Sequence, residues 1–154
     1  MCLYFPIGAL DEPLLVVCNI FRQTGRRYAF SSRMEPVRAL NVKVLVLEDD
    51  DFQRCAIASF CEQAGYKVQA VGSGEECVRL IEGAGQDSPW DLVFCDVWLG
   101  NEPHGVDILL RLRRKFDTGI SIIMVSANEQ AHIVEQCILE GADTSCTLLS
   151  LIHI

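Results

Sequence analysis

The chain has 154 residues, a length typical of a single domain built around one hydrophobic core. Its formal net charge of −8 argues against a surface that binds nucleic acid or an anionic membrane directly, because such a surface needs clustered basic side chains. Half of the residues are hydrophobic, yet no apolar run reaches the roughly eighteen residues of a membrane span, so we expect no membrane-spanning segment.

From residue 41 onward, short β-branched runs alternate with helical patterns. The first elements predicted are a buried strand over 42–47, a helix over 52–64 that Gly65 ends, and a strand over 67–71. Ser73 and Glu76 then form the S-x-x-E pattern of a capping box, which predicts a helix from there to about residue 82.

The same alternation continues toward the end of the chain. A strand over 92–95 precedes a helix over 106–116, and a strand over 120–125 precedes a helix over about 129–140 with Asn128 as its N-cap. The run 144–149 is a candidate fifth strand. Strict alternation predicts parallel strands with right-handed crossovers, and therefore an α/β fold with an open, doubly wound sheet.

Polar residues follow three of these strands. Glu48 and Asp49 end the first apolar run, Asp96 ends DLVFCD, and Ser126 ends ISIIMVS. Ligands of an open parallel sheet bind beyond the carboxyl ends of its strands, so these side chains are predicted to meet at one edge. Neighbouring carboxylates repel one another by roughly 4 kcal/mol per pair at about 4 Å, and a hard divalent ion such as Mg²⁺ relieves that repulsion. The pattern predicts a metal-dependent phosphoryl-transfer site with Asp96 as nucleophile.

With these motifs the sequence resembles the receiver domain of two-component response regulators. The resemblance covers about residues 42–143 and rests on VLVLEDDDFQR, WDLVFCDVWLG, the helix start GVDILL, IIMVSA and the turn EGAD. It implies a flavodoxin-like sheet of five parallel strands in the order 2-1-3-4-5. It also implies a signalling phosphoacceptor, not an enzyme that turns over a substrate.

The resemblance implies partners and a role for each site residue. A sensor histidine kinase or a histidine phosphotransfer protein would phosphorylate Asp96, and the phosphorylated domain would switch an output surface for an unidentified domain or protein. The implied Mg²⁺ ligands are Glu48, Asp49, Asp96 and the backbone carbonyl of Trp98. Ser126 matches the switch hydroxyl, and Ala127 would offer its backbone N–H to the phosphoryl group.

Three features depart from the family pattern. The loop VWLGNEPHG after Asp96 is one residue longer than usual, and Gly100 stands where a proline is common. Leu148 occupies the position of a lysine that contacts the phosphoryl oxygens, a contact worth on the order of 1.5 to 3 kcal/mol. Ser145 stands at the aromatic switch position, and the fifth helix is missing from the sequence.

Both ends of the chain fall outside the resemblance. We expect residues 1–40 to be a non-family extension, with the natural start near Met34. We expect 41–148 to form a truncated receiver domain. The last six residues, LSLIHI, can be encoded by a transposon end that serves as a sequencing adapter, so 149–154 are interpreted as an adapter-derived tail.

The cysteines and the basic residues near the end of the fourth helix receive structural interpretations. The eight cysteines show no C-x-x-C pair and no zinc-like spacing with histidine, and we interpret them as mostly buried, reduced thiols of a cytoplasmic protein. Cys55 and Cys61 are interpreted as helix packing. A cluster of basic side chains is interpreted as a solvated helix end: Arg111, Arg113, Arg114 and Lys115.

The sequence leaves two other functions open. A degenerate receiver would act by protein contact without phosphorylation, and Leu148 and Ser145 favour that alternative. An aspartate-nucleophile phosphatase usually shows D-x-D, so that a second acid protonates the leaving group, whereas Val97 and Trp98 follow Asp96 here.

Overall fold

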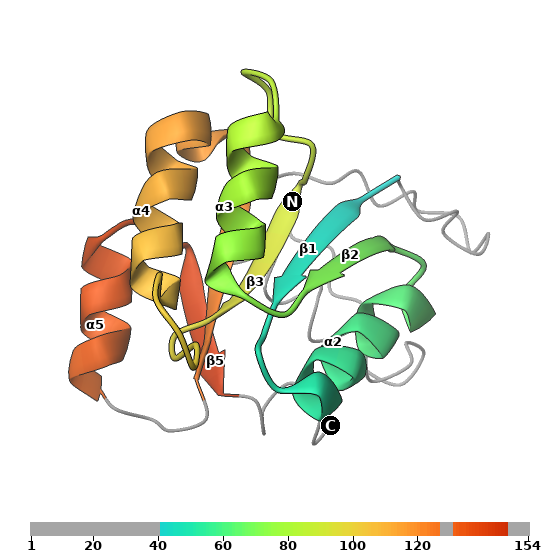
Figure 1. The fold of residues 1–154 in the computed structure, drawn as a ribbon, viewed down its shortest axis with the longest axis horizontal. Helices are drawn as coiled ribbons and strands as arrows, with labels where there is room; N and C mark the ends of the chain where they lie inside the picture. The colour runs from blue at the N-terminus through green and yellow to red at the C-terminus, as the bar shows by residue number, and fades with distance from the viewer. Residues whose placement is uncertain (1–40, 127–130, 148–154) are drawn as a thin grey trace, which may run out of the picture.

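The alternating strands and helices form a layered sheet fold, shown in Figure 1. The structure is a computed structural model that describes residues 41–126 and 131–147. Five strands form one parallel sheet in the order β2-β1-β3-β4-β5. Their bounds are Lys43–Leu47 for β1, Lys67–Val71 for β2, Leu92–Asp96 for β3, Ser121–Ser126 for β4 and Thr144–Thr147 for β5. The predicted doubly wound α/β fold and its strand order 2-1-3-4-5 are confirmed.

Four α-helices connect these strands within the described residues. They are α2 (Asp51–Gln63), α3 (Gly74–Gly83), α4 (Gly105–Phe116) and α5 (Ala131–Leu139), and a short 3-10 helix, η1 (Asp117–Gly119), follows α4. Figure 1 shows α3, α4 and α5 standing side by side, with α2 apart from them near β2. Each of these helices is too short or too polar to cross a lipid bilayer.

The two faces of the sheet bury separate clusters of apolar side chains. Leu45 and Val93 point into the cluster covered by α3, α4 and α5. Val44 and Phe94 point into the opposite cluster, to which α2 contributes Ile57. Residues next to each other along a strand therefore alternate between the two faces, and the central strands read as continuous hydrophobic runs because both faces are covered.

Local signals in the sequence set where the helices begin and end. The Asp50 side chain accepts a hydrogen bond of 2.8 Å from the amide of Gln53 and caps α2. Ser73 caps α3 by accepting from the amide of Glu76 at 3.2 Å, as the capping-box pattern predicts. Gly65 follows α2 with a φ of +84°, a backbone conformation that favours glycine. The predicted N-cap Asn128 lies outside the described residues.

The interpretation of the basic cluster as a solvated helix end is wrong for two of its members. Arg113 lies half-buried, and its guanidinium donates to the backbone carbonyl of Gly141 at 2.6 Å and to the Asp143 carboxylate at 2.6 Å. The Lys115 ammonium donates to the carbonyls of Ile81 and Ala84 and so caps the C-terminus of α3. Both side chains fasten α4 to neighbouring elements.

The cysteines follow their interpretation with one clear exception. Four of them are buried in the core: Cys61, Cys77, Cys95 and Cys137. Cys55 is exposed on α2, so its interpretation as helix packing is wrong. Burial raises the pKa of the Cys61 thiol to about 12, which keeps it protonated at neutral pH. Cys2 and Cys18 lie outside the described residues.

Candidate functional site

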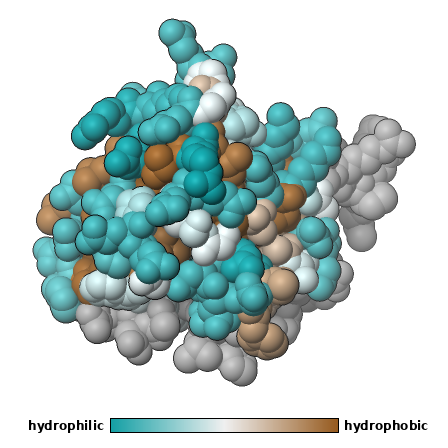
Figure 2. Space-filling view, in the orientation of Figure 1, coloured by the Kyte–Doolittle hydropathy of each residue, from teal (hydrophilic) through white to brown (hydrophobic). Residues whose placement is uncertain are grey.

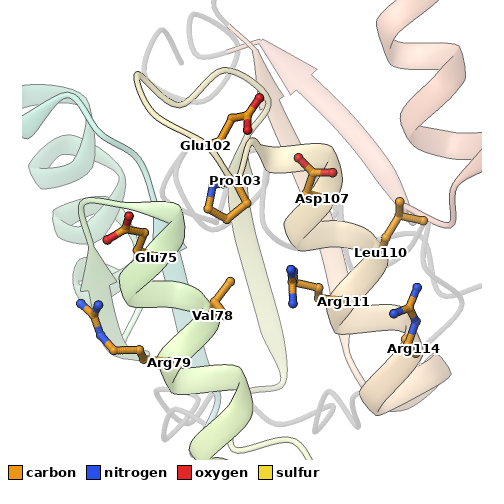
Figure 3. A pocket seen from close by; sticks show the side chains of 9 residues that line it. All are labelled: Glu75, Val78, Arg79, Glu102, Pro103, Asp107, Leu110, Arg111 and Arg114. Atoms are coloured by element: carbon orange, nitrogen blue, oxygen red, sulfur yellow. The ribbon is translucent and has the colours of Figure 1, made fainter.

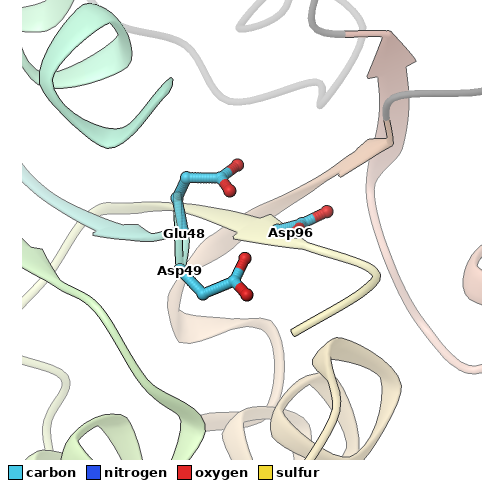
Figure 4. A group of neighbouring side chains, drawn as sticks. All are labelled: Glu48, Asp49 and Asp96. Atoms are coloured by element: carbon cyan, nitrogen blue, oxygen red, sulfur yellow. The ribbon is translucent and has the colours of Figure 1, made fainter. Parts of the chain in front are cut away.

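Three carboxylates meet at the carboxyl edge of the sheet. Glu48 and Asp49 directly follow β1, and Asp96 is the last residue of β3, the strand paired with β1. One carboxylate oxygen from each residue lies within 4.8 Å of the others, and Figure 4 shows the three side chains gathered there. Glu48 is only 2% exposed, Asp96 is half-buried and Asp49 is exposed. We call these three residues the acidic cluster.

Ser126 lies at the same edge of the sheet. It is the last residue of β4, and the pairing of Asp96 with Val125 places Ser126 one residue beyond Asp96 on the neighbouring strand. The amide of Val97 donates to the carbonyl of Val125 at 2.9 Å, which extends the strand pairing past Asp96. Ser126 is 5% exposed. The structure therefore brings together Glu48, Asp49, Asp96 and Ser126, as the sequence predicts.

Burial and mutual repulsion change the acidity of two of these carboxyls. Burial, followed by the negative charge of Asp96, raises the pKa of Glu48 to about 7. Burial also raises the pKa of Asp96 to about 6; the hydrogen bond from the amide of Trp98 opposes this shift, and the charge of Asp49 adds to it. Both carboxyls therefore hold their protons up to a higher pH than an exposed carboxyl does.

The loop after β3 closes over the cluster through two backbone amides. The amide of Trp98 donates to Asp96 Oδ1 at 3.2 Å, and the amide of Gly100 donates to Asp49 Oδ2 at 2.8 Å. The Trp98 side chain is 55% exposed, and its ring lies edge-on to that of His104, with 6.2 Å between centroids. His104 Nδ1 in turn lies 3.0 Å from the carbonyl oxygen of Leu99. The role of the Trp98 carbonyl as a metal ligand stays a prediction.

Sequence reasoning missed Arg54. Its guanidinium donates from Nη1 to the backbone carbonyls of Glu48 at 2.8 Å and Asp49 at 3.3 Å, and it pairs with the Asp51 carboxylate. Arg54 thus fastens the backbone that presents two of the three carboxylates. Its position three residues after Asp51, on one face of α2, is the signal that would have identified it.

Some predicted contributors fall on residues that the structure does not describe. Ala127, with its predicted backbone N–H contact, and Leu148, in place of the family lysine, lie outside the described residues. Ser145 is described: it is half-buried on β5 and pairs with Met124 of β4. The roles of these three positions stay predictions.

Comparison with known proteins identifies the family. The family model described as response regulator receiver domain matches residues 44–147. A cyclic di-GMP phosphodiesterase from Thermotoga maritima is 29% identical over 100 residues, which cover 65% of this chain and 25% of that protein. The two-component response regulator-like protein APRR3 from Arabidopsis thaliana is 32% identical over 111 residues, covering 71% of this chain and 21% of that protein. The matched residues therefore span between a fifth and a quarter of the length of these two relatives.

Solved structures of receiver domains have the same fold. The receiver domain of the Francisella response regulator 1452 superposes with a TM-score of 0.61 at 24% identity, covering 73% of this chain and 92% of that one. The N-terminal domain of a response regulator, sensory box and GGDEF protein from Carboxydothermus hydrogenoformans superposes with a TM-score of 0.60 at 25% identity, covering 69% and 81%. The residues that match the family model include Glu48 and Asp49 after β1 and Asp96 at the end of β3. The chain therefore belongs to the response regulator receiver domains of two-component signalling.

Proposed function

We propose that this receiver domain accepts a phosphoryl group on Asp96 in the presence of Mg²⁺. The observation that carries the proposal is the approach of three carboxylate oxygens to within 4.8 Å of one another, from the ends of two neighbouring strands. Carboxylates this close repel one another in a partly buried setting. Burial, and then the negative charge of the neighbouring carboxylates, raises the pKa of Glu48 and of Asp96. A bound cation would remove the repulsion.

The donor atoms suit a hard divalent ion. Carboxylate oxygens, a backbone carbonyl and water are ligands that Mg²⁺ prefers, and it keeps several waters when only a few protein groups bind it. Glu48, Asp49, Asp96 and the carbonyl of Trp98 would hold it. When bound, the ion neutralises negative charge on the incoming phosphoryl oxygens.

Side chains and backbone amides of the chain would carry out the phosphoryl transfer itself. A carboxylate oxygen of Asp96 attacks the phosphorus of a phosphohistidine, a P–O bond forms as the P–N bond breaks, and the imidazole leaves with the electron pair and takes up a proton. The amide of Trp98 donates to Asp96 Oδ1, so Oδ2 would be the attacking atom. The Ser126 hydroxyl would donate to the transferred group, as would the amide of Ala127.

Family membership supports a proposal for the phosphoryl donor and for the effect of the transfer. A sensor histidine kinase or a histidine phosphotransfer protein would supply the phosphoryl group in the cytoplasm, where the buried thiols stay reduced. The added charge would shift a pre-existing equilibrium toward a state with altered contacts for an output domain or protein. A response regulator from Burkholderia pseudomallei with the same fold, at a TM-score of 0.61 and 20% identity, was solved with a phosphorylated aspartic acid and a calcium ion.

Phosphorylation of the whole chain by acetyl phosphate tests the proposal. We expect intact-mass spectrometry to detect the addition of one phosphoryl group that requires Mg²⁺ and is released by hydroxylamine, as an acyl phosphate should be. Asp96→Ala should abolish the gain, and Asp87→Asn, at an exposed acid outside the site, should leave it unchanged. A gain that persists in Asp96→Ala would contradict the assignment. No gain in the parent chain would instead favour the degenerate receiver, which acts by contact alone.

A further inference from the structure

A groove between α3 and α4 lies apart from the acidic cluster. It encloses about 680 Å³, and no residue of the acidic cluster lines it. Figure 3 shows that its charged side chains separate by sign along the groove. Three carboxylates form what we call the acid end: Glu75, Glu102 and Asp107. Three guanidinium groups form the arginine end: Arg79, Arg111 and Arg114.

These six residues are exposed and form no ion pair with each other or with other described residues. The two ion pairs among the described side chains join Arg54 to Asp51 and Arg113 to Asp143. Glu75 and Arg79 stand four residues apart on α3, a spacing at which acid and base often pair along a helix. They nevertheless remain apart, so their charges stay available to an outside partner.

Side chains of the same charge lie beside one another across the groove. Both helices follow parallel strands and run in the same direction, and each carries an acid one turn before an arginine: Glu75 before Arg79 on α3, and Asp107 before Arg111 on α4. Carboxylates consequently sit beside carboxylates and guanidinium groups beside guanidinium groups. Such a patch has one acidic and one basic pole, so a ligand of uniform charge, such as nucleic acid or an anionic membrane, would be repelled by the acid end.

We propose that the α3–α4 face is a two-fold interface between copies of this chain. A two-fold axis that lies in the interface and crosses the groove at right angles turns the second copy end for end. The acid end of each copy then faces the arginine end of the other. The same patch on the two copies therefore forms two equivalent sets of charge contacts, as a closed two-fold dimer requires. Opposite charges across an interface fix its register and exclude wrong pairings.

The middle of the face supplies apolar contact. Val78 is partly buried on α3, and Leu110 is 37% exposed on α4, between the two charged ends. Figure 2 shows small hydrophobic areas among hydrophilic side chains on this side of the molecule. The methylene stems of the arginines extend this surface and would fill part of the facing groove, with the charged heads at the rim.

Sedimentation equilibrium of the whole chain tests the dimer. At physiological ionic strength, screening reduces the long-range repulsion between two molecules of net charge −8 and leaves contact pairs largely intact. We expect the weight-average mass to rise from 17.2 kDa toward twice that value as concentration increases, and to fall back in about 1 M salt. A chain that stays monomeric at every concentration tested would overturn the proposal.

Charge reversal tests the geometry. We expect Glu75→Lys with Glu102→Lys to weaken self-association by about tenfold or more, and Arg79→Glu with Arg111→Glu to do the same. An equimolar mixture of the two double variants should associate again, because each end then meets its opposite. Association that survives in either variant alone, or that fails to return in the mixture, would contradict this interface.

Two controls distinguish the loss of a specific contact from an effect of net charge and from unfolding. Lys43→Glu with Lys67→Glu, at exposed positions on β1 and β2, changes the net charge as much as the arginine reversal does and should leave association unchanged. Circular dichroism should confirm that every variant is folded. If a reversal variant unfolds, Arg111→Gln replaces it, and that neutral change should still weaken association; unaltered association would overturn the proposal.

Discussion

A Cβ atom added to Gly105 would lie 1.9 Å from the carbonyl oxygen of Asp96. Gly105 is the first residue of α4, and its amide donates to the carbonyl of Val97 at 3.2 Å. The helix therefore begins in direct backbone contact with the strand end that presents the candidate phosphoacceptor. Because the obstructing atom belongs to the backbone, no side-chain rotation can make room for a larger residue.

Gly105→Ala should destabilise the protein by about 1 to 3 kcal/mol and lower the rate of phosphorylation of Asp96, because β3 and α4 must separate to admit the methyl group. Chemical denaturation and the acetyl phosphate assay measure the two effects. Gly83→Ala is the matched control: it has no neighbour within 4 Å and lies at the last position of α3, where alanine should be neutral or stabilising. Equal stabilities for the two variants would contradict the close contact.

Glu48 should make the metal-free protein less stable as pH rises. Its pKa is raised to about 7 from an ordinary value of 4.5, so between these values the folded state holds a proton that the unfolded state has released. The contribution of Glu48 to the free energy of unfolding is therefore fully present below a pH of about 4.5 and is lost as the pH rises to about 7. Thermal unfolding in chelator between pH 8 and pH 5 should show the rise on acidification.

Glu48→Gln is the diagnostic change for that pH dependence. It keeps an oxygen to accept the 3.2 Å hydrogen bond from the amide of Asp50, and it removes the charge, so it should stabilise the protein at pH 8. It should also make the pH profile shallower, and the slope that remains comes from Asp96, whose pKa is raised to about 6. Mg²⁺ should stabilise the parent chain at pH 8 and lose its effect near pH 5, as protons displace it. Glu76→Gln, at an exposed acid, should leave both behaviours unchanged.

Much of the fold could be predicted because local signals and the hydrophobic pattern agree. The buried run 44–47 and the caps Asp50 and Ser73 all act over a few residues, so they can be identified in the sequence. The acidic cluster could be predicted for a related reason: parallel strands bring their carboxyl ends to one edge, whatever the lengths of the connections between them.

Long-range polar contacts could not be predicted in the same way. Lys115 reaches a helix end more than thirty residues earlier in the chain, and Gly100 donates to Asp49, 51 residues before it. No local pattern marks such partners, because the contacts depend on how far each helix is offset along the sheet. A basic run on a helix looks the same whether it is solvated or fastened to a neighbour.

Lys115→Met should destabilise the domain by about 1 to 3 kcal/mol, since it leaves the last carbonyls of α3 without a charged donor and keeps most of the apolar stem. Urea unfolding at low protein concentration measures the change. Arg114→Met serves as the control, because Arg114 is exposed on the same helix and makes no ion pair with the described residues. A larger loss for Arg114→Met would contradict the capping role.

Trp98 should report binding of Mg²⁺ by its fluorescence. Its ring is 55% exposed and its amide is bonded to Asp96 Oδ1, so a cation at the acidic cluster changes the environment of this loop. Trp90, the other tryptophan, is 4% exposed, and its indole N–H donates to Gln69 at 3.0 Å, far from the cluster in the fold.

Titration with Mg²⁺ should therefore alter the emission of a Trp90→Phe variant and leave that of a Trp98→Phe variant unchanged. Asp49→Asn in the Trp90→Phe background should shift the titration to higher Mg²⁺ concentrations, because the change removes one of the proposed charged ligands. A response that persists in Trp98→Phe, or that is indifferent to Asp49→Asn, would mean that the ion binds elsewhere.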